Sequence, residues 1–456
     1  MSQLLIQNGV CVTSASSFKA DLLVEDGKIV QIAQKIEASA ERVIDAQGRY
    51  VLPGGIDVHV HLPWPKGEHI SQDDIRSGSR AAAFGGATTV IDFAIPDEEE
   101  TLHDALEKKL QEARQNAWVD YSFHLNIRGD VRSRLAEIPP LTAAGFPSFK
   151  VFMAYEGFRV DDSDLLRIME TAAAAGGMVD VHAENGPLAD ALTAKLVEQG
   201  KTAPRDYAAA RPEICEVEAI HRALAYQQVT GVRLHIHHVS TAAGAGLIAG
   251  ARQEGRPVSG ETCPHYLTLT NQDYEGDPLL AAAMVCAPSV KSLSDQQGLW
   301  QRLAQGELSV LATDHCPYSR RQKTQSLDHF PGIPGGIGGV ELRLPLIFSA
   351  GVKTGRLSLE RFVDAWATQP ARLFGLYPRK GQIAIGSDAD LAILEPDAVW
   401  TIRAEDLHMN TDCLPYEGWQ VYGRLRAVTL RGEVLVENGN LLPEKPGGML
   451  IPRRLN

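Results

Sequence analysis

Two hydrophobic patterns alternate through the middle of this chain. Short runs that are apolar at most positions, such as Met178–His182, follow longer stretches of mixed apolar and polar residues, such as Ser163–Ala175. The same order recurs where the charged stretch Leu102–Ala113 precedes the run Val119–His124. The apolar runs are typical of buried strands, and the mixed stretches are typical of helices that cover them. The alternation therefore predicts a parallel sheet with helices outside it.

A different pattern, of short strands separated by tight turns, occupies both ends of the chain. Before residue 50 the expected turns lie at Glu25–Lys28 and Ala46–Arg49. After residue 380 the expected strands lie at Gly381–Gly386, Leu391–Leu394 and Ala427–Val434. Turn residues at this spacing between apolar runs are typical of a small antiparallel sheet. We expect the two ends of the chain to form one smaller domain together.

Metal-binding or ionisable side chains stand at the ends of five predicted strands. They are His59 with His61, Lys150, His182, His238 and Asp314. Four imidazoles, a carboxylate and a lysine can hold two divalent cations with space left for a water molecule. Catalytic groups of a (β/α)8 barrel collect at the carboxyl ends of its strands, so these positions favour that fold. We predict an α/β protein with a (β/α)8 TIM barrel over residues 51–379 and a small β-sandwich domain built from residues 1–50 and 380–456.

The spacing of His59 and His61 suggests that they act as a pair. Residues two apart on a strand point to the same side, so these two imidazoles can chelate one cation. The alternative is a half-buried strand with two hydrogen-bonded histidines.

Three histidines crowd the strand that ends in His238. Alternation places His238 on the same face as Leu234 and Ile236, and we interpret this apolar face as the inward one. We expect His235 and His237 to face the surrounding helices and to have structural roles.

Lys150 is the unusual member of the set, because an ammonium group repels the cations that the histidines would bind. Its neighbours Phe149, Val151 and Phe152 predict a buried strand, where burial lowers the pKa of a lysine. The neutral amine can add carbon dioxide and become a carbamate, an anionic group whose two oxygens can bridge two metals. The alternative is an ordinary lysine that reaches solvent or forms a salt bridge.

Composition restricts the class of protein. The length of 456 residues exceeds that of a usual single domain and fits a barrel enzyme with an accessory domain. The content of 44% hydrophobic and 22% charged residues is ordinary for a soluble globular protein. Its net charge of −13 argues against nucleic acid or an anionic membrane as the main partner. The six cysteines show no close-pair spacing, residues 1–8 lack the basic and apolar segments of a secretory signal, and no membrane-spanning run occurs. We therefore expect a reduced, cytoplasmic protein.

Four stretches carry a resemblance to a known family. They are Pro53–His61, Lys150–Tyr155, Val181–Asn185 and Glu261–Leu267. In this order, and over nearly the whole chain, the sequence resembles the cyclic amidohydrolases, closest to dihydropyrimidinases and D-hydantoinases. The resemblance implies an enzyme that opens the cyclic amide bond of hydantoins or dihydropyrimidines to give N-carbamoyl amino acids. It also implies a homotetramer or a homodimer.

The same resemblance implies a centre of two divalent ions, usually zinc, with manganese or cobalt as alternatives. N6-carboxylated Lys150 and a hydroxide would bridge the two ions. The more buried ion would be held by His59, His61 and Asp314, and the more exposed ion by His182 and His238.

Two catalytic roles are implied for side chains at this centre. The bridging hydroxide would attack the ring carbonyl, and Asp314 would carry its proton to the departing ring nitrogen. Tyr155 would donate its phenol proton to the developing oxyanion. Tyr155, Ala287, Ser289 and Gly335 are the expected substrate-binding residues.

Single positions separate this chain from related hydrolases. Dihydroorotases place an arginine two residues after the second histidine to hold the substrate carboxylate, but this chain has Pro63 there. Tyr155 favours a hydantoinase or dihydropyrimidinase over an allantoinase, which stays as an alternative together with other cyclic amide or imide hydrolases. The chain departs from its relatives at Glu156 and Gly335, and these departures affect the expected substrate more than the expected chemistry.

A second class of alternative is a non-catalytic scaffold, because some relatives have lost their metal ligands. All six expected ligand positions remain in this chain, so we favour the enzyme. Aromatic residues that could form an apolar pocket for a ring substituent are Trp64, Phe93, Phe152 and Phe158.

Overall fold

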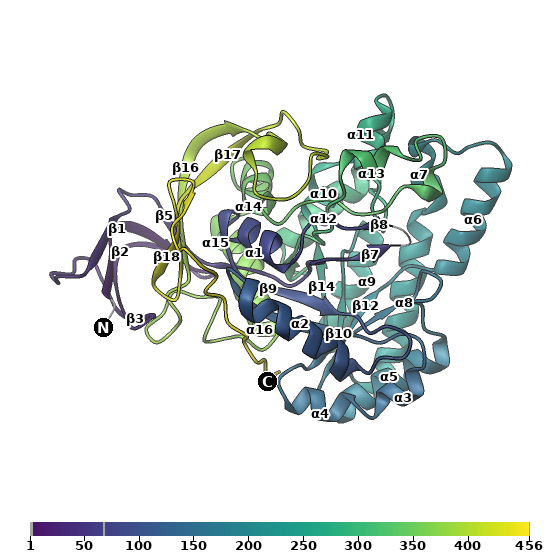
Figure 1. Cartoon of the computed structure of the whole chain (residues 1–456), viewed down its shortest axis with the longest axis horizontal. Coiled ribbons are helices and arrows are strands. Elements are labelled where there is room, and N and C mark those ends of the chain that lie inside the picture. The colour runs from purple at the N-terminus through teal and green to yellow at the C-terminus, as the bar shows by residue number, and fades with distance from the viewer. Residues whose placement is uncertain (1–2, 67–68, 456) are drawn as a thin grey trace.

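The computed structural model describes residues 3–66 and 69–455, so the outermost residues of both terminal segments lie outside the description. Figure 1 shows two parts: a barrel surrounded by helices, and a sheet on its left that contains the first strands and the last long strands of the chain. The predicted fold class, a TIM barrel with a smaller domain built from both ends of the chain, is confirmed.

Eight parallel strands form the barrel sheet, and their spatial order follows the chain. A parallel bridge between Val60 and His315 brings the segments after the first and last strands together. The carboxyl ends of all the strands consequently meet at one face, as in other barrels of this kind. The strands are β6 (Gly55–Asp57), β9 (Ala87–Ala94), β10 (Asp120–Asn126), β11 (Ser148–Phe152), β12 (Met178–His182), β13 (Arg233–Ile236), β14 (Val258–Thr262) and β15 (Val310–Leu311).

Helices cover the outside of this sheet, and local sequence explains where they begin. Helix α2 is capped by Thr101 and buries Leu102, Leu106 and Leu110, which lie four residues apart on one face. Helix α5 is capped in the same way by Asp161. The principal outer helices are α1 (Ile75–Phe84), α2 (Leu102–Asn116), α5 (Asp162–Ala174), α8 (Glu213–Thr230), α9 (Ala242–Gln253), α12 (Leu293–Ala304), α14 (Arg343–Ile347), α15 (Leu359–Val363) and α16 (Gln369–Leu373).

The remaining helices lie in the connections between these units. Helix α6 projects at the right of Figure 1, beyond the barrel face that the strand ends form. None of the helices within the described residues is both long enough and apolar enough to span a bilayer. The connecting helices are α3 (Val131–Leu135), α4 (Ile138–Ala143), α6 (Gly186–Glu198), α7 (Tyr207–Ala210), α10 (Pro264–Thr268), α11 (Pro278–Ala283) and α13 (Arg320–Thr324).

The terminal sheet has nine strands drawn from both ends of the chain. The expected turns are present, with positive φ at Asp26, Gly27, Gln47 and Gly48. The expected strand over Gly381–Gly386 is wrong, because this segment is irregular and only joins α16 to the sheet. The strands are β1 (Gln3–Val12), β2 (Ser17–Glu25), β3 (Lys28–Ala33), β4 (Arg42–Asp45), β5 (Tyr50–Pro53), β16 (Leu391–Thr401), β17 (Gln420–Leu430), β18 (Glu433–Glu437) and β19 (Asn440–Leu441).

A buried lysine joins the sheet to the barrel. The Nζ atom of Lys380 lies 2.5 Å from a carboxylate oxygen of Asp120 at the start of β10. It also lies 3.0 Å from Asp388 and 2.6 Å from Asp390, which precede β16. Three carboxylates and one ammonium therefore fasten the two parts of the molecule together.

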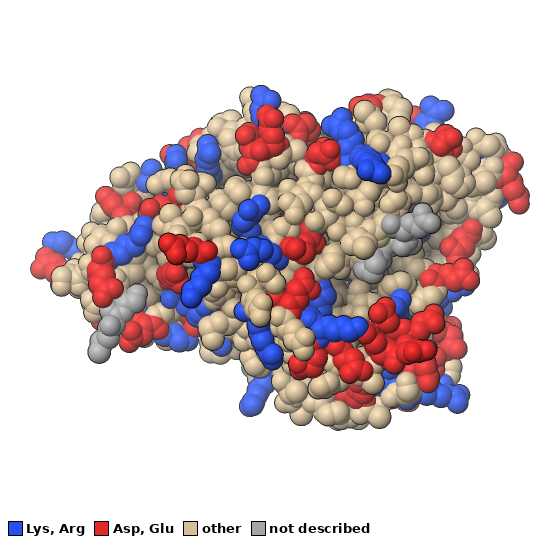
Figure 2. All heavy atoms as spheres, in the orientation of Figure 1, with Lys and Arg blue, Asp and Glu red and all other residues tan. Residues whose placement is uncertain are grey.

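Charged side chains are mixed over the face drawn in Figure 2. Lysine and arginine alternate with acidic residues, and a group of acidic residues gathers at the lower right, where Figure 1 places α3 and α5. The described residues form no continuous basic surface on this face, in agreement with the negative net charge.

Candidate active site

A cavity of about 300 Å³ opens at the carboxyl ends of the barrel strands. All six predicted metal ligands line it, although they come from five different strand ends. Tyr155, Ala287 and Gly335 line it as well, whereas Ser289 does not. The predicted ligands that meet here are His59, His61, Lys150, His182, His238 and Asp314.

His59, His61 and Asp314 form one compact group of ligand atoms. The Nε2 atoms of His59 and His61 lie 3.0 Å and 2.9 Å from the same carboxylate oxygen of Asp314. Both histidines are buried, and their ligand atoms and that of Asp314 lie within 4.8 Å of one another. Burial lowers the pKa of His61 to about 4, so its imidazole is neutral and available to a cation. This group has the donor types that a divalent metal such as zinc prefers.

His182 and His238 lie together on the other side of the cavity. Their ring centroids are 4.5 Å apart, and both side chains are buried. Burial lowers the pKa of both imidazoles, that of His182 to about 4. The Nδ1 atom of His238 is buried and has no hydrogen-bond partner. Such an unpartnered buried atom fits a second cation site beside the first.

The backbone at His238 changes which way the side chains at the end of β13 point. His238 has φ of 38°, so strand alternation ends before it and its side chain turns toward the cavity. His235 and His237 face the barrel interior, and the expectation that they face the helices is wrong. Leu234 and Ile236 belong instead to the apolar layer under the outer helices.

Lys150 is buried at the centre of the site. Its Nζ atom has no hydrogen-bond partner and lies 5.3 Å and 4.9 Å from the ring centroids of Phe93 and Phe152. Burial lowers the pKa of this amine to about 8, which increases the fraction of the nucleophilic neutral form. The predicted burial of Lys150 in an apolar strand is thus confirmed.

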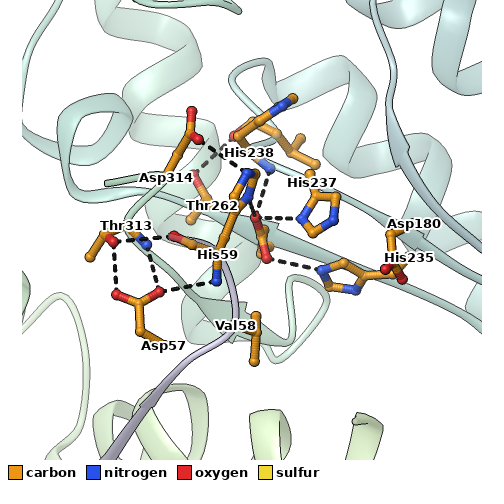
Figure 3. A network of polar contacts seen from close by, with 12 residues as sticks. Asp57, Val58, His59, Asp180, His235, His237, His238, Thr262, Thr313 and Asp314 are labelled. Atoms are coloured by element: carbon orange, nitrogen blue, oxygen red, sulfur yellow. Dashed lines mark hydrogen bonds and ion pairs between the residues drawn. The ribbon is translucent and has the colours of Figure 1, made fainter. Parts of the chain in front are cut away.

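Glu261 is the main residue of the site for which sequence reasoning proposed no role. Its carboxylate contacts Nδ1 of His59, lies 2.9 Å from Nδ1 of His237, and lies 3.1 Å from Nε2 of His235. It also accepts a hydrogen bond of 3.2 Å from the backbone N–H of His238. Figure 3 shows these imidazoles directed to one carboxylate. Glu261 therefore orients candidate ligands from two strands, and the signal available in the sequence was its place at the start of the stretch Glu261–Leu267, which carries part of the family resemblance.

The segment that carries Asp314 is tied to the first barrel strand. Asp57 accepts hydrogen bonds of 2.7 Å from Oγ1 and 3.2 Å from the backbone N–H of Thr313, as Figure 3 shows. Asp314 itself has φ of 49°, which aims its carboxylate at the two histidines. Burial raises the pKa of this carboxyl, but His59 and His61 outweigh it and hold the pKa well below its usual value.

Tyr155 is the third site residue with left-handed backbone, with φ of 68°. Its ring centroid lies 5.1 Å from that of His182, beside the proposed metal position. Burial raises the pKa of the phenol well above its usual value, so the hydroxyl keeps its proton at neutral pH. The group can therefore act as a hydrogen-bond donor in the cavity.

Aromatic residues form the outer wall of the cavity. Trp64, Phe152 and Phe158 line it, and Trp64 and Phe158 pack with ring centroids 5.3 Å apart. Phe93 does not line the cavity, contrary to the expectation, because its ring stacks behind His61 at 4.8 Å. Cys316 lines the cavity as well.

The loop after α11 supplies another wall. Ala287 faces the cavity, whereas the Ser289 side chain turns away, donating a hydrogen bond of 3.1 Å to the carbonyl of Arg211 and lying 2.9 Å from Nζ of Lys291. Gly336, which also lines the cavity, has φ of 156° and approaches Cys316 so closely that no Cβ would fit. A side chain at Gly336 would therefore collide with the opposite wall.

Comparison with known proteins identifies the family. The model of the amidohydrolase family matches residues 50–434. The chain belongs to the amidohydrolase family. This amidohydrolase is similar to a D-hydantoinase of Geobacillus stearothermophilus, at 42% identity over 98% of this chain and 96% of that protein. It is also similar to a D-hydantoinase of Streptomyces coelicolor, at 39% identity over 99% and 98% of the two chains.

Solved structures agree with the sequence comparison. The dihydropyrimidinase from Brevibacillus agri superposes on this amidohydrolase with a TM-score of 0.96 at 39% identity, over 99% of both chains. The L-hydantoinase (dihydropyrimidinase) from Arthrobacter aurescens superposes with a TM-score of 0.93 at 35% identity, over 99% of this chain and 100% of that one. The predicted resemblance and the predicted enzyme class, a cyclic amidohydrolase, are confirmed. The comparisons give no support to the allantoinase or scaffold alternatives.

Proposed function

We propose that this amidohydrolase opens the ring of 5-substituted hydantoins or dihydropyrimidines and releases N-carbamoyl amino acids. The observation that carries the proposal is the meeting of six candidate metal ligands and Tyr155 around one cavity with an aromatic outer wall. In the reaction, one water adds to a ring carbonyl carbon, and the bond from that carbon to the ring nitrogen breaks.

Two divalent ions fit the donor atoms of this cavity, and we propose zinc, with manganese or cobalt as alternatives. His59, His61 and Asp314 would hold one ion, and His182 and His238 the other. Lys150, carboxylated at N6, would be a shared ligand, since its amine is buried and has no hydrogen-bond partner. When bound, two such ions supply Lewis acidity and lower the pKa of water, so that hydroxide is available at neutral pH.

The protein's own groups would move the protons. Asp314 would take the proton of the attacking water and deliver it to the departing ring nitrogen. Tyr155, protonated at neutral pH, would donate a hydrogen bond to the oxyanion that develops on the carbonyl oxygen. Backbone groups at Ala287, Ser289 and Gly335 would hold the ring, since the Ser289 side chain is engaged elsewhere.

Substrate choice would depend on the cavity wall. Trp64, Phe152 and Phe158 offer apolar contact to a substituent on the ring. Pro63 provides no cation for a substrate carboxylate, which disfavours dihydroorotate. Apolar 5-substituents should therefore be accepted better than carboxylated ones.

An assay panel tests this proposal. Enzyme loaded with zinc, manganese or cobalt is given 5-substituted hydantoins, dihydrouracil, allantoin and dihydroorotate, and ring opening is followed by ultraviolet absorbance. We expect hydantoins or dihydrouracil to be the best substrates, and Tyr155→Phe to lower their kcat by roughly a hundredfold or more with bound metal unchanged. Dihydroorotate or allantoin as the best substrate would contradict the assignment, and an unchanged kcat in Tyr155→Phe would remove the phenol from the reaction.

We further propose a cytoplasmic homotetramer or homodimer. All six cysteines are free thiols, and five of them are buried, as suits a reducing compartment. Sedimentation of the purified protein measures the subunit number directly, and a monomer would contradict this proposal.

A further inference from the structure

Arg211 stands behind the cavity wall, between α7 and α8. Its Nη1 atom forms a short ion pair with Oε2 of Glu184, and its guanidinium carbon lies 5.6 Å from the ring centroid of Tyr155. Its side chain is only 13% exposed. Arg211 does not line the catalytic cavity, so any effect on the reaction must pass through its neighbours.

Glu184 connects this arginine to a candidate metal ligand. Its side chain is buried in the segment between β12 and α6, and Oε2 lies 3.4 Å from Nε2 of His182. A carboxylate in contact with a ligating imidazole fixes the orientation of the ring. The position of Glu184 is in turn fixed by Arg211.

The backbone of Arg211 contacts a third part of the site. Its carbonyl oxygen accepts hydrogen bonds of 2.6 Å from Nζ of Lys291 and 3.1 Å from Oγ of Ser289. These residues follow Ala287, which lines the cavity. One residue thus contacts the segments that carry His182, Tyr155 and the Ala287 loop.

We propose that Arg211 is a positioning residue for the hydrolysis. It holds His182 in place through Glu184, and it holds Tyr155 in place by contact with the phenol ring. The fixed, planar guanidinium suits this role, because it can pair with a carboxylate and lie against an aromatic face at once. The inference rests on the proposed function where turnover is the measurement. The alternative is that the ion pair of Arg211 and Glu184 only stabilises the fold. In that case the effects of changing His182 or Tyr155 would not depend on Arg211.

A double-mutant cycle in steady-state kinetics tests the link to Tyr155. Arg211→Gln should lower kcat about 10- to 100-fold with a smaller change in KM, because Tyr155 acts on the transition state. In a Tyr155→Phe background the same substitution should have an effect at least about fivefold smaller. Equal effects in the two backgrounds would overturn the proposal. Arg211→Lys should recover part of kcat, because it restores the ion pair without the planar group.

Metal affinity, measured by competition with a chelator, tests the link to His182 without any substrate. Arg211→Gln and Glu184→Gln should each weaken metal binding about tenfold or more. The double variant should weaken metal binding no further than either single variant, because each of the three variants breaks the same chain of contacts from Arg211 through Glu184 to His182. If the double variant instead weakens metal binding by the product of the two single effects, Arg211 does not act on His182 through Glu184. The double variant also leaves no unpaired buried carboxylate, so a folded protein stays available if a single variant does not fold.

Arg222→Gln is the matched control. Arg222 lies on α8 and pairs with Asp162 at 2.7 Å and with Glu218 at 3.0 Å, at the surface. Its loss should change kcat and metal affinity less than about twofold, because exposed ion pairs contribute little. If the unmodified protein hydrolyses no cyclic amide, the proposed function fails, whereas the chelator experiment still decides whether Arg211 positions His182.

Discussion

Lys150 differs from the other candidate ligands because it cannot bind a cation in its ordinary protonated form. The structure buries it among Phe93 and Phe152 and provides no hydrogen-bond partner for its amine. A buried amine without a partner is costly, and conversion to a carbamate would give it two acceptor oxygens and a negative charge. In the proposed two-metal centre, the chemistry of this one residue would therefore decide whether two cations can be held close together.

Lys150→Ala should lose most bound metal and most ring-opening activity, because two cations would face each other without a shared anion. Metal content by elemental analysis and turnover on a hydantoin measure both losses. A short carboxylic acid added to the variant should restore part of each by taking the place of the carbamate. Lys195→Ala, which removes an exposed lysine of α6, is the control and should behave like the unmodified protein. Full metal content in Lys150→Ala would contradict the shared-ligand role.

At the scale of elements, the end of β13 shows where sequence reasoning succeeded and where it failed. The position of His238 at the cavity follows from its place at a strand end. The directions of His235 and His237 could not be predicted, because alternation holds only while the backbone stays extended, and His238 is left-handed. The neighbouring residues do not indicate the left-handed backbone at His238, because glycine, the residue that most often adopts it, is absent there.

The loop after His238 is held by Glu216 of α8. This buried carboxylate accepts hydrogen bonds from the backbone N–H groups of Ser240 and Thr241, at 2.9 Å and 3.3 Å. Burial raises the pKa of Glu216 to about 7, although Lys291 and the Ser240 hydrogen bonds act in the opposite direction. The folded protein thus binds this proton more tightly than the unfolded chain does.

The free energy of unfolding should therefore fall as pH rises from about 4.5 to 7, and the contribution of Glu216 to this fall should be roughly 3 kcal/mol. Glu216→Gln carries no titrating proton and should remove that part of the pH dependence. Urea unfolding of both proteins between pH 5 and pH 8, in steps of about half a unit, measures the difference. Parallel stability curves for the two proteins would show that Glu216 does not titrate in this range.

At the scale of the whole molecule, the order of strands and helices could be predicted well because the hydrophobic pattern of a parallel barrel is strong. Helices α2 and α5 begin within one residue of the expected positions. The contacts between the barrel and the terminal sheet could not be predicted, because they join residues far apart in the chain. Lys380 and Asp120 are separated by 260 positions, and neither stands in a recognisable motif.

Lys380→Met tests how strongly this junction depends on one charge. The substitution leaves Asp120, Asp388 and Asp390 without their shared cation and should lower the free energy of unfolding at pH 7 by about 3–5 kcal/mol. In the unmodified protein burial raises the pKa of Asp388, but Lys380 and the neighbouring cations outweigh burial and lower the pKa to about 2. The contribution of Asp388 to the free energy of unfolding is therefore fully present above about pH 4 and is lost as pH falls toward 2.

In the variant Asp390 loses its ion pair, whereas Asp120 keeps Arg431 and Asp388 keeps Lys28 and Arg379. Asp390 should then take up a proton at higher pH, so the destabilisation should shrink between pH 7 and pH 4. Urea unfolding at the two pH values measures this change. Lys353→Met is the control, because Lys353 pairs with an Asp397 side chain that is 88% exposed, and it should cost less than about 1 kcal/mol. A loss for Lys380→Met that is equal at both pH values would mean that packing, not charge, accounts for it.

The left-handed backbone at Tyr155, His238 and Asp314 has a consequence for directed evolution of this protein. Such a conformation costs a residue with a side chain on the order of 1–3 kcal/mol, and contacts elsewhere in the barrel must offset this cost. Glycine or asparagine at these positions would relieve the backbone and would also remove the side chains to which we assign the chemistry. If these three residues have the roles proposed above, a library selected for heat resistance alone would accumulate inactive proteins, and turnover has to be selected in every round.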